Sequence, residues 1–294
     1  MIFALASIPL FLCIQCKQKG GENVLKQVND CPQTSREKPR FSKGVYATLL
    51  MLLALSGFYA VGAEGMTVAA NKRELPIYCV DRSDNKISIS FDAAWGGDQT
   101  EEILNILDAY GVKTTFFLVD IWSERFPELV TEIDARGHEI GNHSTSHPQM
   151  SRLSAQKIRE ELTKMDDRLE SLIGKRSALF RPPYGDYNNL VVRTARDAGY
   201  EVIQWSVDSL DWKNKGTEDL IRRATSNVKS GDILLFHNDS KYILQALPKV
   251  LESLQQQGFE IVPISQLLLD GNTVIDTQGR QKAAPETVPE VEKP

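Results

Sequence analysis

From residue 86 onward, the hydrophobic positions switch repeatedly between a strand pattern and a helical pattern. Residues 86–91 alternate apolar and polar side chains, which is typical of a strand, whereas the apolar residues of 99–110 fall on one helical face that ends at Gly111. The same alternation predicts further strands at 114–119, 138–142, 178–180, 201–206, 233–236 and 260–263, and helices at 127–136, 154–173, 189–198, 217–228 and 243–257. Such strand–helix steps predict a mainly parallel sheet, either open or closed into a barrel.

A barrel is favoured because the chemically capable side chains come directly after the strands. In parallel α/β barrels the working groups lie on the loops at the carboxyl ends of the strands. We therefore expect an α/β fold, an irregular (β/α) barrel of about seven parallel strands, over residues 86–269, preceded by a linker and lead-in chain at 65–85. From residue 270 the chain is rich in Pro, Glu and Gln, which predicts a disordered tail over 270–294.

An unbroken apolar stretch at 45–63 precedes this domain and follows several basic residues. Its length suits a bilayer crossing, and the basic flank predicts a cytoplasmic N-terminus with an exported domain. Residues 41–64 are therefore predicted to be a membrane anchor or a signal peptide; small residues at 61–63 suit cleavage near Ala63, so both forms stay open. We interpret residues 1–40 as a poorly ordered N-terminal extension.

Composition narrows the classes of partner. The net charge of −5 and pI near 5.5 give no basic surface, which argues against nucleic acid as a partner.

Three of the four cysteines precede the apolar stretch, so Cys79 has no intrachain partner in the exported part and the domain is not a disulfide scaffold. We expect a monomer.

His143 and His147 are two of only four histidines and lie four residues apart after a predicted strand. Two imidazoles at this spacing can bind one divalent metal, although an isolated pair also arises by chance in an exposed loop. Four other predicted strand ends also carry polar groups, at residues 91–98, 181–185, 208–212 and 235–237. Taken singly, Asp92 suits a helix cap, Arg181 a surface ion pair and His237 a core histidine. Five such segments in order favour a common site.

These segments resemble the motifs of the NodB-type polysaccharide deacetylases, in family order, over residues 86–268. That family removes acetyl groups from N- or O-acetylated sugars of polymers, on an irregular (β/α) barrel. The sequences Ser-Phe-Asp-Ala-Ala-Trp-Gly at 90–96 and Leu-Pro-Ile-Tyr-Cys-Val at 75–80 look most like the membrane-anchored branch of spore-forming bacteria, tied to peptidoglycan or sporulation.

The resemblance implies a role for each matching residue. His143 and His147 match the metal-binding histidines, suited to Zn²⁺ or to Co²⁺, Ni²⁺ or Mn²⁺. Asp92 matches the catalytic base and His237 the general acid. Arg181 matches the partner of the base, and the Tyr184 peptide N–H matches an oxyanion donor. Asp208 matches the carboxylate that orients His237, and Asp211 is near enough to share that task. Trp212 and Leu235, with Tyr184, match groove-lining residues.

One position departs from the family pattern. The usual motif has a second aspartate after the base as third metal ligand, whereas this chain has Ala93. Asp98 is the nearest carboxylate that could replace it, either directly or through a water; the alternative is that Asp98 caps the helix beginning near Gln99.

The expected function is therefore a metal-dependent hydrolase that removes N-acetyl groups from N-acetylglucosamine or N-acetylmuramic residues of cell-wall glycan. It would act at the outer face of the cell membrane or after secretion. Two alternatives stay open: a catalytically impaired member that binds glycan, and a deacetylase of chitin oligomers or O-acetylated xylan.

Overall fold

The computed structural model describes residues 44, 47–48, 50–52 and 73–285. The chain divides into two compact units, residues 1–68 and 69–294. In the first unit the described residues are helical, and Leu50, Met51 and Leu52 are exposed. None of the described helices combines the length and the apolar character that a bilayer crossing needs. Most of the predicted anchor at 41–64, the whole extension at 1–40 and the predicted cleavage site lie outside the described residues.

The second unit is built on an eight-stranded sheet in which every described pairing is parallel. Its strands are β2 (Lys86–Ala93), β3 (Thr115–Leu118), β4 (Glu139–Asn142), β5 (Leu179–Phe180), β6 (Glu201–Val202), β7 (Val207–Asp208), β8 (Ile233–His237) and β9 (Glu260–Ile261). Their order is β6-β5-β4-β3-β2-β8-β7, with β9 paired to the start of β2. The curled sheet confirms the predicted irregular (β/α) barrel, which stays open between β6 and β7.

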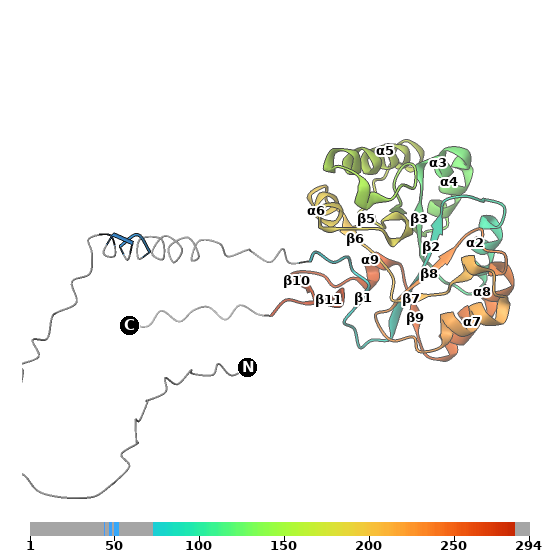
Figure 1. Ribbon diagram of the computed structural model, residues 1–294. Helices are drawn as coiled ribbons and strands as arrows, with labels where there is room; N and C mark the ends of the chain where they lie inside the picture. Colours follow the sequence, from blue (N-terminus) through green and yellow to red (C-terminus); the bar gives the residue numbers. More distant parts are fainter. Residues whose placement is uncertain (1–43, 45–46, 49, 53–72, 286–294) are drawn as a thin grey trace, which may run out of the picture. The chain divides into compact units, whose positions relative to one another are not determined.

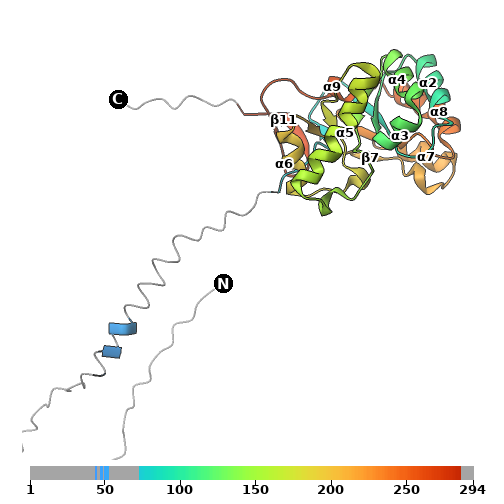
Figure 2. The same cartoon turned by 90° about the horizontal axis from the view of Figure 1, so that it is seen from above.

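Helices surround this sheet. They are α2 (Thr100–Ala109), α3 (Asp120–Arg125), α4 (Pro127–Ala135), α5 (Ala155–Ile173), α6 (Asn189–Asp197), α7 (Thr217–Thr225), α8 (Ile243–Gln256) and α9 (Ile264–Leu267). Helices α2, α7 and α8 gather on one side, and α3, α4 and α5 on another (Figure 1). Seen from above, the helices α6, α5, α3, α7 and α8 follow one another from left to right (Figure 2). The sequence pattern did not predict α3 or α9, because six and four residues are too few to display a helical period.

Successive side chains of the central strand β2 point alternately to the helix-covered face of the sheet and to the barrel interior. Phe91 stacks on Phe116 of β3 with ring centroids 5.0 Å apart, and it belongs to the core cluster shared with the helices. Ser90 and Asp92 point to the opposite face, where both side chains hydrogen-bond to Arg181. The polar positions of the strand pattern thus line the barrel interior, and Asp92 stands near its carboxyl end.

The strand predicted at 201–206 is wrong as a single element. Residues Glu201–Val202 pair with β5 at one edge of the sheet, whereas Val207–Asp208 pair with β8 at the other. Between them the backbone N–H of Gln204 donates to the carbonyl of Ile77. The segment crosses the barrel opening along the chain that precedes β2, so residues predicted as one strand pair with two distant edges of the sheet.

The prediction of a disordered tail from residue 270 is wrong where the structure describes that segment, and the predicted linker and lead-in at 65–85 contains a strand. A second sheet joins β1 (Cys79–Val80), β11 (Arg280–Ala283) and β10 (Thr273–Ile275) in that order. Gln281 is 3 % exposed, and its side-chain oxygen accepts from the Leu269 N–H. Backbone pairing with β1 orders this polar hairpin, which composition alone does not reveal. Residues 286–294 lie outside the described residues.

Candidate active site

Asp92 and Arg181 form a buried ion pair at the carboxyl end of β2. Arg181 is completely buried; its Nη1 donates to Asp92 Oδ1 at 2.6 Å and its Nη2 to Ser90 Oγ at 2.8 Å. Burial alone would raise the pKa of Asp92, but the positive charge of Arg181, aided by His143 and His237, outweighs it and lowers that pKa. Asp92 is therefore an ionised carboxylate held in one orientation, as a base requires.

His143 and His147 follow β4 and lie beside this pair. His143 Nδ1 donates to the Arg181 carbonyl at 2.6 Å, which turns Nε2 toward Asp92 Oδ2, 3.5 Å away. The two imidazole centroids are 5.0 Å apart. Burial lowers the pKa of both rings, that of His147 to about 4, so both are neutral at pH 7. Neutral imidazole is the form that binds metal ions.

His237 ends β8, and Asp211 fixes its ring. Asp211 Oδ1 accepts from His237 Nδ1 at 2.7 Å and Oδ2 from the His237 backbone N–H at 2.8 Å. Burial alone would lower the pKa of His237, but the hydrogen bond and the charge of Asp211 raise it. The assignment of this role to Asp208 is wrong: its Oδ1 accepts from the Leu210 N–H at 2.8 Å, within the left-handed turn at Leu210 that carries Asp211 to the histidine.

The predicted groove residues differ in how deeply they are buried. Tyr184 is 64 % exposed and Trp212 is 55 % exposed, so both stand at the rim of the site. The ring centroids of Tyr184 and His147 lie 4.4 Å apart, and Tyr184 has φ 59° in its turn. Leu235 is only 3 % exposed and is the register partner of Ser90, two residues before His237. It belongs to the floor of the site rather than to an open groove.

Comparison with known proteins identifies this arrangement. The family model for polysaccharide deacetylase matches residues 80–203. A peptidoglycan-N-acetylglucosamine deacetylase of Bacillus cereus is 37 % identical over 194 residues, which span 64 % of this chain and 91 % of the relative. The chain belongs to the polysaccharide deacetylase family. Relatives named as peptidoglycan deacetylases hydrolyse carbon–nitrogen bonds other than peptide bonds, which confirms the predicted enzyme class.

Two solved structures share the deacetylase fold. A CE4 family pseudoenzyme from Bacillus anthracis is 32 % identical, with a TM-score of 0.63 over 65 % of this chain and 68 % of that chain. A peptidoglycan N-acetylglucosamine deacetylase bound to an N-oxidanyl-benzamide compound is 28 % identical, also with a TM-score of 0.63, over 65 % of this chain and 91 % of that chain. The fold thus accommodates both an active enzyme and a pseudoenzyme.

The donor set of this deacetylase fits a divalent metal in part. His143 and His147 present neutral nitrogens, and His147 Nδ1 is buried with no hydrogen-bond partner. Within residues 73–285 and the few described before them, however, no three His, Cys, Asp or Glu side chains are grouped to bind one ion. Two imidazoles therefore fit the metal, and the third protein ligand usual in catalytic zinc sites is not supplied.

Asp98 fulfils neither expectation formed for it. Its side chain is exposed and the structure does not group it with the two imidazoles. It does not cap α2 either, because Gln99 occupies the N-cap position and no side chain accepts a hydrogen bond there. The physical reason lies in the preceding loop: the Gly96 carbonyl is held by Trp122 Nε1 and Asn238 Nδ2, which fixes the path of the chain before Asp98.

Glu161 on α5 holds the histidine loop, a role that the sequence did not reveal. Its Oε2 accepts from the backbone N–H groups of Thr145 at 2.9 Å and Ser146 at 2.8 Å, and its Oε1 accepts from Ser146 Oγ at 2.8 Å. Ser144 and His147 both adopt positive φ in this loop. The carboxylate stabilises a backbone path that places His147 beside His143. One glutamate among many on α5 gives no sequence signal for this.

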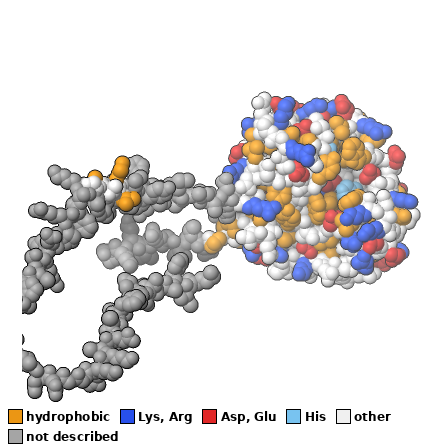
Figure 3. Space-filling view, viewed as in Figure 1, with side chains coloured by type: hydrophobic (Ala, Val, Ile, Leu, Met, Phe, Trp, Pro, Cys, Tyr) orange, Lys and Arg blue, Asp and Glu red, His pale blue; other side chains and the backbone are white. Residues whose placement is uncertain are grey.

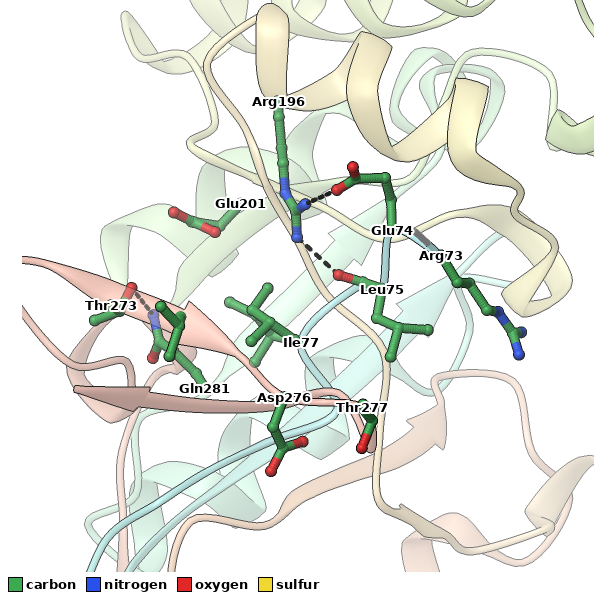
Figure 4. A pocket seen from close by; sticks show the side chains of 12 residues that line it. Arg73, Glu74, Leu75, Ile77, Arg196, Glu201, Thr273, Asp276, Thr277 and Gln281 are labelled. Carbon is green, nitrogen blue, oxygen red and sulfur yellow. Dashed lines mark hydrogen bonds and ion pairs between the residues drawn. The ribbon is translucent and has the colours of Figure 1, made fainter. Parts of the chain in front are cut away.

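A separate cavity of about 680 Å³ lies between the lead-in chain, the end of α6 and the β10–β11 hairpin. In Figure 4, Arg196 bridges the Glu74 carboxylate and the Leu75 carbonyl across it. It lies at the amino end of β6, beside Glu201, whereas Asp92, His143 and His237 lie at or just after the carboxyl ends of their strands. None of the candidate catalytic residues lines it.

Proposed function

We propose that the protein removes N-acetyl groups from cell-wall glycan, at N-acetylglucosamine or N-acetylmuramic residues of peptidoglycan. The observation that carries this proposal is the pairing of Asp92 with His237 in register on adjacent strands, one with a lowered pKa and the other with a raised pKa. A carboxylate base and an imidazolium acid facing one site are what amide hydrolysis requires.

Each residue then has a definite task. Asp92, kept ionised by Arg181, accepts a proton from the attacking water. His237, whose protonated form the hydrogen bond and charge of Asp211 favour, donates a proton to the departing amine nitrogen. The peptide N–H of Tyr184 donates a hydrogen bond to the oxygen on which negative charge develops at the acyl carbon. Acetate and a free amino sugar are the products.

His143 and His147 would hold the divalent metal, for which Zn²⁺ is our first choice over Co²⁺, Ni²⁺ or Mn²⁺. When bound, such an ion lowers the pKa of water and polarises the acetyl carbonyl. With Ala93 at the usual third-ligand position, we expect weaker metal affinity than for a site with three protein ligands.

Acetate release from purified peptidoglycan, with and without added Zn²⁺, tests the proposal. The Asp92→Asn variant should retain the metal dependence of its melting temperature and lose about 10²- to 10⁴-fold in turnover. Near-normal turnover would remove Asp92 from the role of base. Parallel assays on chitin oligomers and O-acetylated xylan distinguish the alternative substrates.

A second candidate function is that of a glycan-binding member with impaired catalysis. The observation that favours it is the Ala93 substitution, together with the likeness to a pseudoenzyme. Absence of acetate release under every divalent metal, with retained binding to peptidoglycan, would support this alternative.

We further propose that the domain acts outside the cytoplasm, as a monomer, either anchored by the apolar stretch at 45–63 or released after cleavage near Ala63. The motif sequences at 75–80 and 90–96 support a link to sporulation. Fractionation of producing cells with N-terminal sequencing of the mature protein distinguishes anchored from cleaved forms, and light scattering measures the oligomeric state.

A further inference from the structure

Trp95 stands exposed beside the histidine pair, although no role has been assigned to it above. It follows Asp92 by three residues and is 58 % exposed. Its ring centroid lies 5.8 Å from that of His147 at an interplanar angle of 73°. Tyr184 contacts the same imidazole at 4.4 Å. Histidine atoms reach the surface among hydrophobic side chains in the space-filling view (Figure 3). Two exposed aromatic rings thus lie beside His147.

The loop that carries Trp95 is fixed from several sides. The Gly96 carbonyl accepts from Trp122 Nε1 at 2.9 Å and from Asn238 Nδ2 at 2.6 Å. Gly97 packs so closely on the Phe126 ring that a Cβ there would lie 2.9 Å from it. The indole is therefore presented on a rigid support, which reduces the entropy that binding would cost.

Folding alone does not explain an exposed indole at this position. Burial of a tryptophan side chain stabilises a fold, yet more than half of this residue faces solvent, and its one ring contact among the described residues is with His147. Large exposed aromatic side chains next to catalytic groups are typical of ligand-binding surfaces.

We propose that Trp95 forms a sugar-binding subsite, in which the indole face packs against the C–H face of a pyranose ring of the glycan next to the acetylated residue. The inference rests on the proposed function. A polymer passing over the site extends beyond the sugar that reacts, and it meets two exposed aromatic rings beside His147, those of Trp95 and Tyr184. The apolar ring faces of a sugar suit an indole, while its hydroxyl groups remain in water.

Equilibrium binding of tetra-N-acetylchitotetraose to the full-length chain tests the subsite, in the Asp92→Asn background so that turnover cannot deplete the ligand. Trp95→Ala should raise the Kd about tenfold, and Trp95→Phe only about twofold to threefold, because a smaller ring keeps part of the contact. Leu190→Ala, which truncates an exposed apolar residue on α6, is the matched control and should leave the Kd unchanged.

Kinetics on peptidoglycan separate substrate contact from an effect through His147. With Asp92 restored, Trp95→Ala should raise KM and leave kcat within about twofold, since the sugar makes the same contact in the ground and transition states. An unchanged Kd would overturn the subsite alone, and so would a fall in kcat and zinc content at unchanged Kd. A chain that binds the tetrasaccharide through Trp95 but releases no acetate would sink the deacetylase proposal and leave the subsite standing. No binding by the parent chain would overturn both.

Discussion

Asp92 and His237 are register partners on the adjacent parallel strands β2 and β8, and each is oriented by a different buried or largely buried partner. Arg181 binds Asp92 at 2.6 Å, and Asp211 binds His237 at 2.7 Å. Opposite charges next to each member move the two pKa values apart, so an ionised carboxylate faces a histidine that favours its protonated form. The neighbouring residues His143 and His147 are neutral in the same site, because burial lowers the pKa of each ring more than the nearby charges raise it.

Removal of either ligand histidine should abolish specific metal binding. Because two imidazoles are the only neutral nitrogen donors grouped in the described site, His143→Ala or His147→Ala should reduce zinc stoichiometry, measured after dialysis, to near zero and lower acetate release at least about 10²-fold. His138→Asn is the control, since His138 is buried away from the pair beside Phe116 and should not affect zinc content. Full zinc stoichiometry in both alanine variants would refute the ligand assignment.

The acid histidine offers a test through the pH dependence of turnover. Asp211 raises the pKa of His237, so activity that needs imidazolium is lost as the pH rises through that pKa. Asp211→Asn should lower this pKa and move the basic limb of the kcat profile to lower pH. Asp208→Asn, which alters only the acceptor of the Leu210 N–H, should leave the limb in place. A shift caused by Asp208→Asn alone would reverse the assignment.

The hydrogen bonds of Glu161 predict a coupled loss of stability and metal affinity. Glu161→Ala removes the acceptor of two backbone N–H groups in the histidine loop and should lower the free energy of unfolding by about 1–3 kcal/mol. It should also weaken zinc binding, because the positive-φ path of the loop loses its support. Glu161→Gln retains one acceptor, so its stability and zinc affinity should lie between those of the parent chain and those of Glu161→Ala. Glu160→Ala, which removes the exposed neighbour, is the control. Unchanged zinc affinity in Glu161→Ala would limit the residue to a role in stability.

His138 predicts a loss of stability on mild acidification. Burial lowers its pKa from 6.5 to about 4, so between these values the unfolded state binds a proton that the folded state does not. The folded state therefore loses stability as the pH falls from 6.5 toward 4, by a total on the order of 3 kcal/mol. In His138→Asn the amide oxygen can still accept from the Thr114 N–H, as His138 Nδ1 does, but does not titrate. Denaturant unfolding at several pH values gives the free energy of unfolding as a function of pH. Between pH 4 and 6.5 this free energy should change less steeply with pH in the variant than in the parent chain, and an identical pH dependence would contradict the prediction.

Several elements followed from local pattern alone. The β-branched alternation of β2 and the amphipathic period of α5, with Ser154 as its N-cap and Gly174 at its end, are properties of neighbouring residues, so the sequence predicts them. The placement of Asp92, His143 and His237 at the carboxyl ends of strands also follows, since these ends of parallel strands meet at one edge of the barrel. These three residues lie together as expected.

Only the tertiary structure decided which side chains complete the site. The choice of Asp211 over Asp208 depends on a left-handed turn at Leu210, and the role of Glu161 depends on how α5 packs against a loop before it in sequence. The ordering of 273–283 depends on backbone pairing with β1, which lies about 200 residues earlier in the sequence. Hydrophobic period and cap chemistry act over a few residues, so the sequence determined the elements and their chemical content. Contacts between segments far apart in the chain depend on three-dimensional packing, which no local pattern encodes.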